Sequence, residues 1–221
     1  MISIIVPTRN EGVEIVEKFR QFCGRADAEL LVADGGGSTG TAQAFQAIGA
    51  SVLTLSGNRG SRLAAAATRA RGDVLLFLHG DSRAPDDAIG LVRLAVERGA
   101  AAGAFSLAYD GSGRALSWIA WWANIRSRLL KLPFGDQGLF CRKDAYERAG
   151  GFRDLPICDD VDLVRRLART GRFVILPEKT ATSPRRYRER GALRQVLLNW
   201  KVLAGYYLGV SPATLDRWYN R

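Results

Sequence analysis

The 221-residue chain has little cysteine and little histidine: three cysteines and one histidine. Cys23, Cys141 and Cys158 are odd in number and far apart, and no two of them form a Cys-x-x-Cys pair. This pattern excludes a disulfide framework and a zinc cluster, so we expect a protein of a reducing compartment, the cytoplasm. The only histidine, His79, ends an apolar run and stands two residues before Asp81.

Long hydrophobic runs are also absent. The first residues, MISIIVPTRNE, have no basic segment, and their apolar run is too short for a signal peptide. The segments ALSWIAWWANI (115–125) and VLLNWKVLAGYYLGV (196–210) fall short of the roughly 20 apolar residues that a membrane-spanning helix needs. We therefore expect that nothing in this chain crosses a membrane.

The first half of the chain has no excess of positive charge, although the net charge of the whole chain is +10. Residues 1–110 carry 11 basic against 12 acidic side chains, and residues 111–221 carry 21 against 10. A basic C-terminal half suits contact with anions, which leaves open a phosphorylated substrate, an anionic lipid or a nucleic acid. Solubility alone is the alternative explanation.

Apolar segments alternate with segments of helical spacing over the first hundred residues. The expected strands are residues 3–7, 28–34, 51–56 and 73–79, and the expected helices are 12–25, 41–50 and 62–72. The strands are apolar throughout rather than alternating, which indicates a sheet covered by helices on both faces. The alternation predicts a doubly wound α/β fold whose ligands bind at the carboxyl ends of the strands.

The second half continues with a different mixture of elements. We expect a strand at residues 101–109, an aromatic helix at 115–132, and a helix that begins at residue 159 and ends at Gly171. No linker and no internal repeat is evident, and the composition, 47% hydrophobic and 24% charged, is that of an ordinary globular protein. A single large domain is therefore expected.

A glycine-rich segment, GGGSTG at residues 35–40, matches the dinucleotide-binding pattern G-x-G-x-x-G. It follows the second expected strand rather than the first, and the next strand ends at Ser56 without the acid that binds a ribose. Asp34, directly before the glycines, would repel a pyrophosphate. We therefore interpret the glycines as a turn, and a nicotinamide- or flavin-dependent oxidoreductase remains the alternative function.

The polar strand ends carry an ordered set of motifs. These are SIIVPTRNE, LLVADGGGSTGT, GDVLLFLHGDS, and GDQGLFCRKDAYERAGGF followed by DDVDLVRRLARTG. In this order they resemble the inverting family-2 glycosyltransferases with the GT-A fold, over about residues 2–176. The HGD segment stands where that family has its DxD metal motif, and it resembles a short cytosolic subgroup that reads FLHAD there. The resemblance implies a GT-A domain over residues 1–180 and a basic helical extension, residues 181–221, packed on the same domain.

The resemblance also implies a chemistry. The family moves a sugar, here of the hexosyltransferase type, from a nucleotide-diphosphate donor to an acceptor hydroxyl, with a divalent cation bridging the diphosphate. The donor would be a UDP- or GDP-sugar, the cation Mn²⁺ or Mg²⁺, and the acceptor is unknown. The departing diphosphate gains negative charge, which a cation and arginines stabilise, and a hydroxyl needs a positioned base to become a good nucleophile.

The resemblance assigns roles residue by residue. The metal ligands would be Asp81 and His79, and the general base Asp160, with Asp159 in reserve. The nucleotide-binding residues would be Pro7, Thr8, Arg9, Glu11, Asp34, Gly35, Arg59, Arg62 and Gly80. Asp136 and Gln137 would face the acceptor. The helix after Arg59 departs from the family because LAAAAT lacks its usual asparagine.

Each assignment has a structural alternative. His79 could be a neutral loop histidine bonded to the backbone, and aspartates before a helix often only cap its amides. The functional interpretation requires Asp34, Asp81 and Asp160 to converge on a single cleft.

The aromatic helix around Trp118, Trp121 and Trp122 also carries Arg126 and Arg128. Tryptophans beside basic residues are typical of helices that lie in the surface of an anionic membrane, here the inner face. Such a stripe also suits a buried core or a homodimer contact, and all three remain open. A nucleic-acid adaptor is the weakest alternative, because acids at the strand ends have no use in that role.

Overall fold

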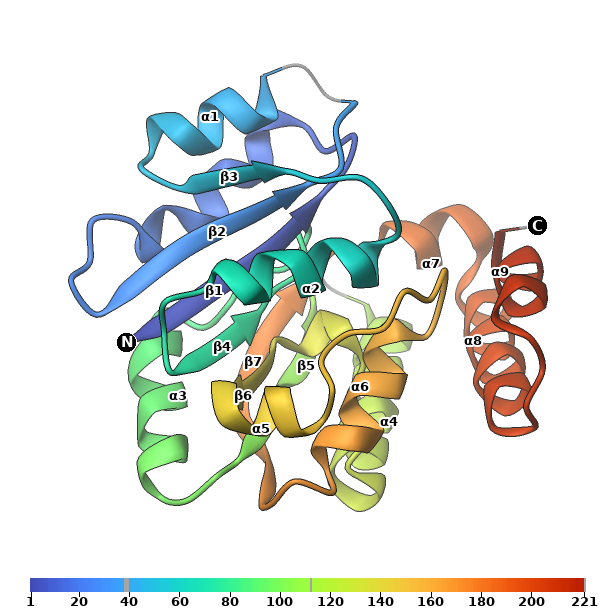
Figure 1. Ribbon diagram of the computed structural model, residues 1–221. Coiled ribbons are helices and arrows are strands. Elements are labelled where there is room, and N and C mark those ends of the chain that lie inside the picture. The colour runs from blue at the N-terminus through green and yellow to red at the C-terminus, as the bar shows by residue number, and fades with distance from the viewer. Residues whose placement is uncertain (38–39, 112, 221) are drawn as a thin grey trace.

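The computed structural model describes residues 1–37, 40–111 and 113–220. Part of the predicted glycine-rich turn, residues 38–39, therefore lies outside the described residues. Figure 1 shows a twisted seven-stranded sheet with helices on both faces. The strand order is β3-β2-β1-β4-β6-β5-β7.

Five of the strands lie close to the predicted segments, whereas β6 and β7 were not predicted. Their bounds are β1 Ile2–Thr8, β2 Ala28–Asp34, β3 Ser51–Thr54, β4 Val74–Phe77, β5 Ala102–Tyr109, β6 Leu139–Arg142 and β7 Phe173–Thr182. The pairs β1–β2, β1–β4, β2–β3 and β5–β7 are parallel, whereas β6 is antiparallel to both β4 and β5. The sheet is therefore mixed, as the GT-A resemblance implies.

The helices fill the connections. Their bounds are α1 Thr41–Ala47, α2 Arg59–Arg69, α3 Ala88–Glu97, α4 Arg114–Leu130, α5 Lys143–Arg148, α6 Asp159–Leu167, α7 Arg185–Arg190, α8 Ala192–Tyr207 and α9 Pro212–Asn220. Two 3-10 helices, η1 Val13–Phe22 and η2 Gly135–Gln137, complete the described elements. The segment predicted as the first helix is thus present as the 3-10 helix η1.

Side chains of β1 point alternately to two separate cores. Ile4 and Val6 pack with the buried side chains of η1, α1 and α3, whereas Ile5 packs with those of α2, α5 and α6. Because both faces of the strand are buried, its sequence is apolar throughout instead of alternating. The predicted α/β sheet with helices on both faces is confirmed.

The carboxyl ends of β1, β2 and β4 lie at one edge of the sheet. Thr8 at the end of β1 pairs in register with Asp34 at the end of β2, and Ile5 pairs with Phe77 at the end of β4. The polar segments that follow these strands therefore emerge side by side, at the edge where α/β folds bind ligands.

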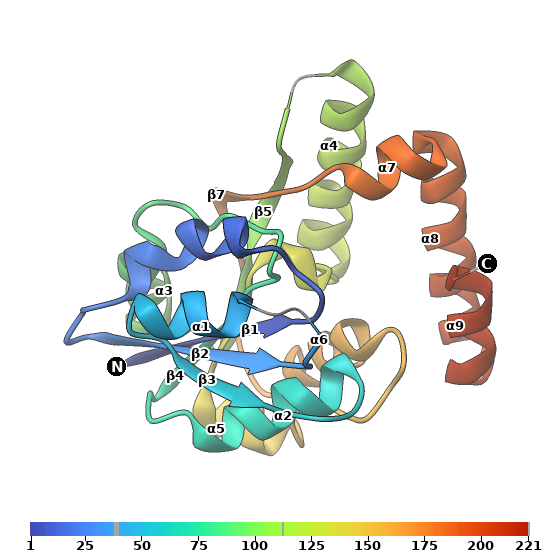
Figure 2. The same ribbon diagram turned by 90° about the horizontal axis from the view of Figure 1, so that it is seen from above.

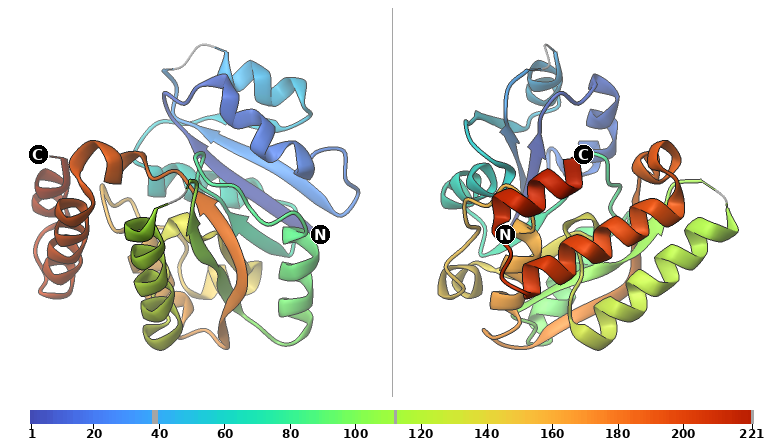
Figure 3. Two further views of the ribbon diagram at one scale, coloured as in Figure 1. Left: turned by 180° about the vertical axis from the view of Figure 1, so that it is seen from behind. Right: turned by 90° about the vertical axis from the view of Figure 1, so that its right-hand side faces the viewer.

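Strand β7 pairs with β5 as far as Thr182, where the chain leaves the sheet. Helix α7 then leads to α8 and α9, which stand at one side of the molecule in Figure 2. In the right-hand view of Figure 3, α8 runs beside α4, which it contacts. Val202 and Leu203 of α8 and Leu215 of α9 belong to the core that also contains α6. Among the described residues, no helix combines the length and the apolar character needed to cross a membrane.

Candidate functional site

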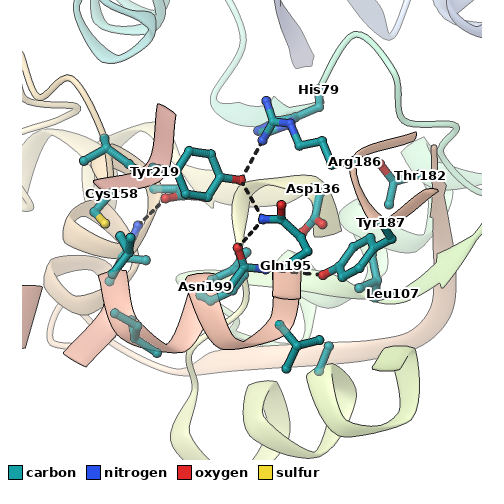
Figure 4. Close-up of a pocket in the computed structure, with 18 of the residues that line it drawn as sticks. His79, Leu107, Asp136, Cys158, Thr182, Arg186, Tyr187, Gln195, Asn199 and Tyr219 are labelled. Atoms are coloured by element: carbon teal, nitrogen blue, oxygen red, sulfur yellow. Dashed lines mark hydrogen bonds between the residues drawn. The ribbon is translucent and has the colours of Figure 1, made fainter. Parts of the chain in front are cut away.

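A cavity of about 660 Å³ lies between the edge of the sheet and the C-terminal helices. Asp81, Asp136 and Asp160 line it from the core of the fold, and α4, α7, α8 and α9 supply the opposite wall. Figure 4 shows Asp136 together with Gln195, Asn199 and Tyr219 of the C-terminal helices. Carboxylates from distant parts of the sequence therefore share one cavity. Arginines, among them Arg59 and Arg126, line it as well, so its wall carries side chains of both charges.

Asp159 is the first residue of α6, and its carboxylate forms an ion pair with Arg59 of α2. Its two oxygens accept hydrogen bonds from Arg59 Nη2 at 2.5 Å and from Arg59 Nε at 3.0 Å, and its side chain is 3% exposed. This bidentate pair ties α6 to α2 across 100 residues of sequence. Asp159 is therefore a structural anion, and the geometry does not favour it as the reserve base.

Asp160, the next residue, faces the cavity in a different setting. Its Oδ2 accepts a hydrogen bond from the Gly135 amide at 2.7 Å, and its Oδ1 accepts one from the Val161 amide at 2.8 Å. Burial raises the pKa of this carboxyl, but the charge of Arg59 and the amide bonds outweigh burial, and the net shift is downward. Asp160 is therefore ionised at neutral pH and lies 16% exposed toward the cavity.

Gly135 allows this arrangement because it has no side chain. A Cβ at this position would lie 2.7 Å from His79 Nε2 and 2.9 Å from Asp160 Oδ2, which is too close for either. The glycine therefore lets its own amide reach the carboxylate of Asp160. The sequence placed Gly135 in the GDQG segment without indicating this role, and the available signal was a glycine directly before Asp136.

His79 follows β4 and lies against Arg59. Its Nε2 is 2.9 Å from Arg59 Nη1, and since a guanidinium can only donate, Nε2 is the acceptor and carries no proton. Burial, followed by the nearby charge of Arg59, lowers the pKa of His79 to about 4. The histidine is thus neutral, and its Nε2 lone pair accepts the hydrogen bond from Arg59. In this arrangement Nε2 is not available to a metal ion, so of the two predicted ligands we carry Asp81 forward.

Asp81 is half-buried on the cavity wall, and Lys18 Nζ donates to its backbone carbonyl at 2.8 Å. Its carboxylate accepts no hydrogen bond from the described residues. Nearby Glu11 has a raised pKa, mainly through burial and then through the negative charge of Asp81.

No group of three or more metal-ligating side chains exists among the described residues. A single free carboxylate fits Mg²⁺ or Mn²⁺, which often bind through one or two carboxylates together with substrate phosphates.

The residues predicted to bind the nucleotide form a buried cluster beside the cavity. Thr8 Oγ1 donates to Asp34 Oδ1 at 3.0 Å, and the Gly35 amide donates to the Thr8 carbonyl at 2.8 Å. Arg62 Nη1 donates to the same carbonyl at 2.6 Å and to the carbonyl of Ala33 at 3.1 Å. Asp34 is 8% exposed and is not part of the cavity wall. Asp81 and Asp160 therefore share the cavity, whereas Asp34, the third residue expected to converge there, does not line it.

The other predicted nucleotide residues surround the same edge. Pro7 lines a small void together with Arg59, His79 and Asp160, so the end of β1 reaches the acidic cluster. Gly80 packs beside the Pro7 carbonyl, which lies 3.5 Å from where a Cβ would stand. Arg9 is exposed, and its charge acts on Arg62, whose pKa is lowered chiefly by burial and then by Arg9.

Asp136 and Gln137, predicted to face the acceptor, separate in the structure. Gln137 is fully buried, and its amide donates to the Phe105 carbonyl while accepting from Ser127 Oγ and the Phe134 amide. Gln137 thus ties the loop around Phe134 to β5, and it does not line the cavity. Asp136 does line the cavity, and its Oδ1 is buried without a hydrogen-bond partner. Burial, opposed by Arg126, raises the pKa of Asp136 to about 6.

Replacing Asp136 with asparagine is expected to stabilise the protein at alkaline pH. The folded state favours the protonated form of Asp136. Its contribution to the free energy of unfolding is therefore complete below the unfolded pKa near 3.8 and is lost as pH rises through about 6. An asparagine is neutral at every pH and avoids that loss. A pKa raised from 3.8 to about 6 corresponds to about 3 kcal/mol, so we expect the melting temperature of D136N to exceed that of the wild type by about 6–12 °C at pH 8 and to match it near pH 4. Asp110→Asn, at an exposed site, is the control, and equal effects of both variants would contradict the explanation.

The profile of the family described as Glycosyl transferase family 2 matches residues 3–150 of the chain. The search of curated proteins found no match to the chain.

Among solved structures, TarS residues 1–349 from S. aureus has a TM-score of 0.65 at 18% identity, over 89% of this chain and 65% of that one. A mannosyltransferase from Pyrobaculum calidifontis, in complex with GDP-Man and Mn²⁺, has a TM-score of 0.66 at 17% identity, over 91% of this chain and 60% of that one. The chain thus spans less than two thirds of both.

A third similar structure is glucosyl-3-phosphoglycerate synthase from Mycobacterium tuberculosis, solved with Mn²⁺, UDP-Glc and phosphoglyceric acid. Its TM-score is 0.61 at 18% identity, over 90% of this chain and 77% of that one. TarS has also been solved with UDP-GlcNAc. At these identities the likeness shows a shared fold.

Proposed function

Because the chain belongs to glycosyl transferase family 2, we propose that it transfers a hexose from a UDP- or GDP-linked donor to an acceptor hydroxyl, with inversion at the anomeric carbon. The observation that carries this proposal is the shared cavity of Asp81 and Asp160 at the carboxyl edge of the sheet. A site that breaks a sugar–diphosphate bond needs a place for a cation and a separate base, and these two carboxylates supply both.

Asp160 is the residue that takes the acceptor proton. Its carboxylate is ionised and oriented by the amides of Gly135 and Val161, and it faces a cavity large enough for a sugar. The acceptor oxygen attacks the anomeric carbon, the bond from that carbon to the diphosphate oxygen breaks, and the diphosphate leaves with the electron pair. Displacement in one step inverts the configuration, and the hydroxyl proton passes to Asp160.

Asp81 is the residue that would hold a divalent cation. The cation, Mn²⁺ or Mg²⁺, would supply positive charge to the departing diphosphate. Similar folds have been solved with UDP-GlcNAc, with GDP-Man and Mn²⁺, and with UDP-Glc and Mn²⁺, which supports this class of donor and ion. Arg59 is held by Asp159 beside His79, so its charge is fixed near the same edge.

The proposal is tested by thermal unfolding with UDP or GDP, each with and without Mn²⁺. Binding to the folded state raises the melting temperature by mass action, and we expect a rise that requires both nucleotide and cation. Asp81→Asn is expected to remove the cation-dependent part, because it removes the charge of the free carboxylate. Asp86→Asn, at an exposed residue of the following loop, is the control. No shift with either nucleotide, or an unchanged shift in D81N, would refute the proposed site.

A further inference from the structure

Three buried polar atoms on the walls of the cavity have no hydrogen-bond partner. They are Arg126 Nη2 of α4, Asp136 Oδ1 of the core, and Gln195 Oε1 of α8. Only two other buried side-chain atoms in the described residues share this condition, those of Arg62 and Thr180. Buried polar groups are normally hydrogen-bonded, so their concentration around one cavity indicates a site completed by a ligand.

Arg126 is held in place before any ligand arrives. Its Nε donates to the Leu132 carbonyl at 3.1 Å, and its guanidinium lies 3.6 Å from the centre of the Phe134 ring. Arg126 is one of the residues that line the cavity, and its buried Nη2 has no hydrogen-bond partner among the described residues. A fixed guanidinium with a free donor is suited to an anionic oxygen, above all that of a phosphate.

The far wall of the cavity is polar and ordered. Gln195 Nε2 donates to Asn199 Oδ1 at 2.8 Å, and Asn199 Nδ2 donates to Tyr187 Oη at 3.3 Å. Arg186 and Gln195 both contact Tyr219 Oη, as Figure 4 shows. This network fixes the C-terminal helices around the cavity and leaves the Gln195 carbonyl as an unused acceptor.

The mouth of the cavity is apolar and open to solvent. Trp118 and Trp122 of α4 and Trp200 of α8 line the cavity, yet they are 59%, 47% and 53% exposed. Leu193 and Leu197 of α8, 73% and 60% exposed, extend the apolar surface outward. An exposed apolar surface that continues into a cavity marks a binding site for an apolar group.

The helices around this mouth are strongly basic. Within their bounds α4, α7 and α8 carry nine arginines and lysines and a single acid, Glu189. Tryptophan and leucine among basic side chains form a surface complementary to an anionic amphiphile, whose charged and apolar parts both find partners.

We propose that this cavity is the acceptor subsite and that it takes an anionic amphiphile, a hydroxyl-bearing lipid phosphate. The inference rests on the proposed function for the identity of the reaction. The phosphate binds at Arg126, the hydroxyl lies toward Asp136 and Asp160, and the hydrocarbon chain leaves between Trp118, Trp122 and Trp200. The same mouth then brings the protein to the surface of an anionic membrane that holds the acceptor.

The test measures the binding of decyl phosphate, below its micelle concentration, to the full chain by tryptophan fluorescence. Three of the five tryptophans line the cavity mouth, so an alkyl chain there changes the signal. We expect decyl phosphate to bind at least about tenfold more tightly than inorganic phosphate, because its alkyl chain buries apolar surface at the tryptophans.

Variants separate the two parts of the site. Arg126→Gln is expected to weaken decyl phosphate at least about tenfold through loss of the charged hydrogen bond, whereas Arg69→Gln, on exposed α2 surface, leaves it unchanged. Trp122→Ala, at an exposed position that is safe for folding, is expected to weaken decyl phosphate and not inorganic phosphate. Retained melting temperature and retained shift with nucleotide and Mn²⁺ show that each variant is folded.

Three results would overturn the inference. One is equal binding of inorganic phosphate and decyl phosphate, which would make this a site for free phosphate. Another is the absence of binding by either probe. The third is a dimer that Leu197→Asp dissociates, which would assign the apolar mouth to a second copy of the chain. Failure of the nucleotide shift while decyl phosphate still binds would refute the proposed function and leave the amphiphile site standing.

Discussion

Asp160→Asn is expected to lower kcat by about 10²–10⁴-fold, the usual contribution of a general base. Asparagine has nearly the same shape, and its carbonyl can still accept the hydrogen bond from the Gly135 amide, while the bond from the Val161 amide is lost. It cannot take a proton from a hydroxyl. Because the ion pair of α6 with Arg59 is made chiefly by Asp159, the fold and the donor affinity should change little. The measurement is the rate of nucleoside diphosphate release at saturating donor and acceptor.

Asp162 provides the matched control two residues along α6. Its carboxylate pairs with Arg166 at 2.5 Å and lies 10% exposed, and it is not part of the cavity wall. Asp162→Asn should therefore lower stability while leaving kcat of the folded enzyme near the wild-type value. If D160N keeps most of its kcat, the base lies elsewhere, and the assignment of Asp160 fails.

Asp159→Ala is expected to destabilise the protein by about 3 kcal/mol. Breaking a buried ion pair by removing one partner costs about 3–5 kcal/mol, and the lower end applies because 32% of the Arg59 side chain is exposed. The loss leaves the Arg59 guanidinium without its bidentate partner. For a domain of this size, that free energy corresponds to a melting temperature about 6–12 °C lower.

An exposed ion pair gives the comparison for this prediction. Asp144 on α5 pairs with Arg142 and Arg148, and all three side chains are more than two-fifths exposed. Asp144→Ala should cost no more than about 1 kcal/mol, as surface pairs do. Urea unfolding measures both values, and a D159A variant as stable as D144A would show that Arg59 and Asp159 do not hold α6 to α2.

Local pattern predicted most of the sheet. The apolar runs of β1, β2 and β4 are long enough to identify buried strands, and their polar ends gave the edge where Asp81 lies. Strand β7, Phe173–Thr182, was not predicted, and neither was the four-residue strand β6, Leu139–Arg142. The antiparallel place of β6 between β4 and β5 depends on pairing with distant residues. The first expected helix became the 3-10 helix η1, a difference that apolar spacing does not resolve.

The site was predictable where a residue's role follows from its place at an element end. Asp81 and Asp160 reach one cavity because one follows a strand and the other begins a helix at the same edge. The roles of Asp159 and His79 could not be predicted, since both are set by Arg59, about 100 and 20 residues away in sequence. Arg126 was noticed only as a basic residue of an aromatic helix, because its unpaired nitrogen depends on tertiary packing.

Anomalous diffraction at the manganese edge, from crystals grown with UDP or GDP and Mn²⁺, tests the central claim most directly. The expected result is a single manganese bound to a carboxylate oxygen of Asp81 and to the diphosphate, with Asp160 facing the space beyond the terminal phosphate. Manganese bound away from Asp81, or a nucleotide bound far from the cavity that Asp81 and Asp160 share, would contradict the account.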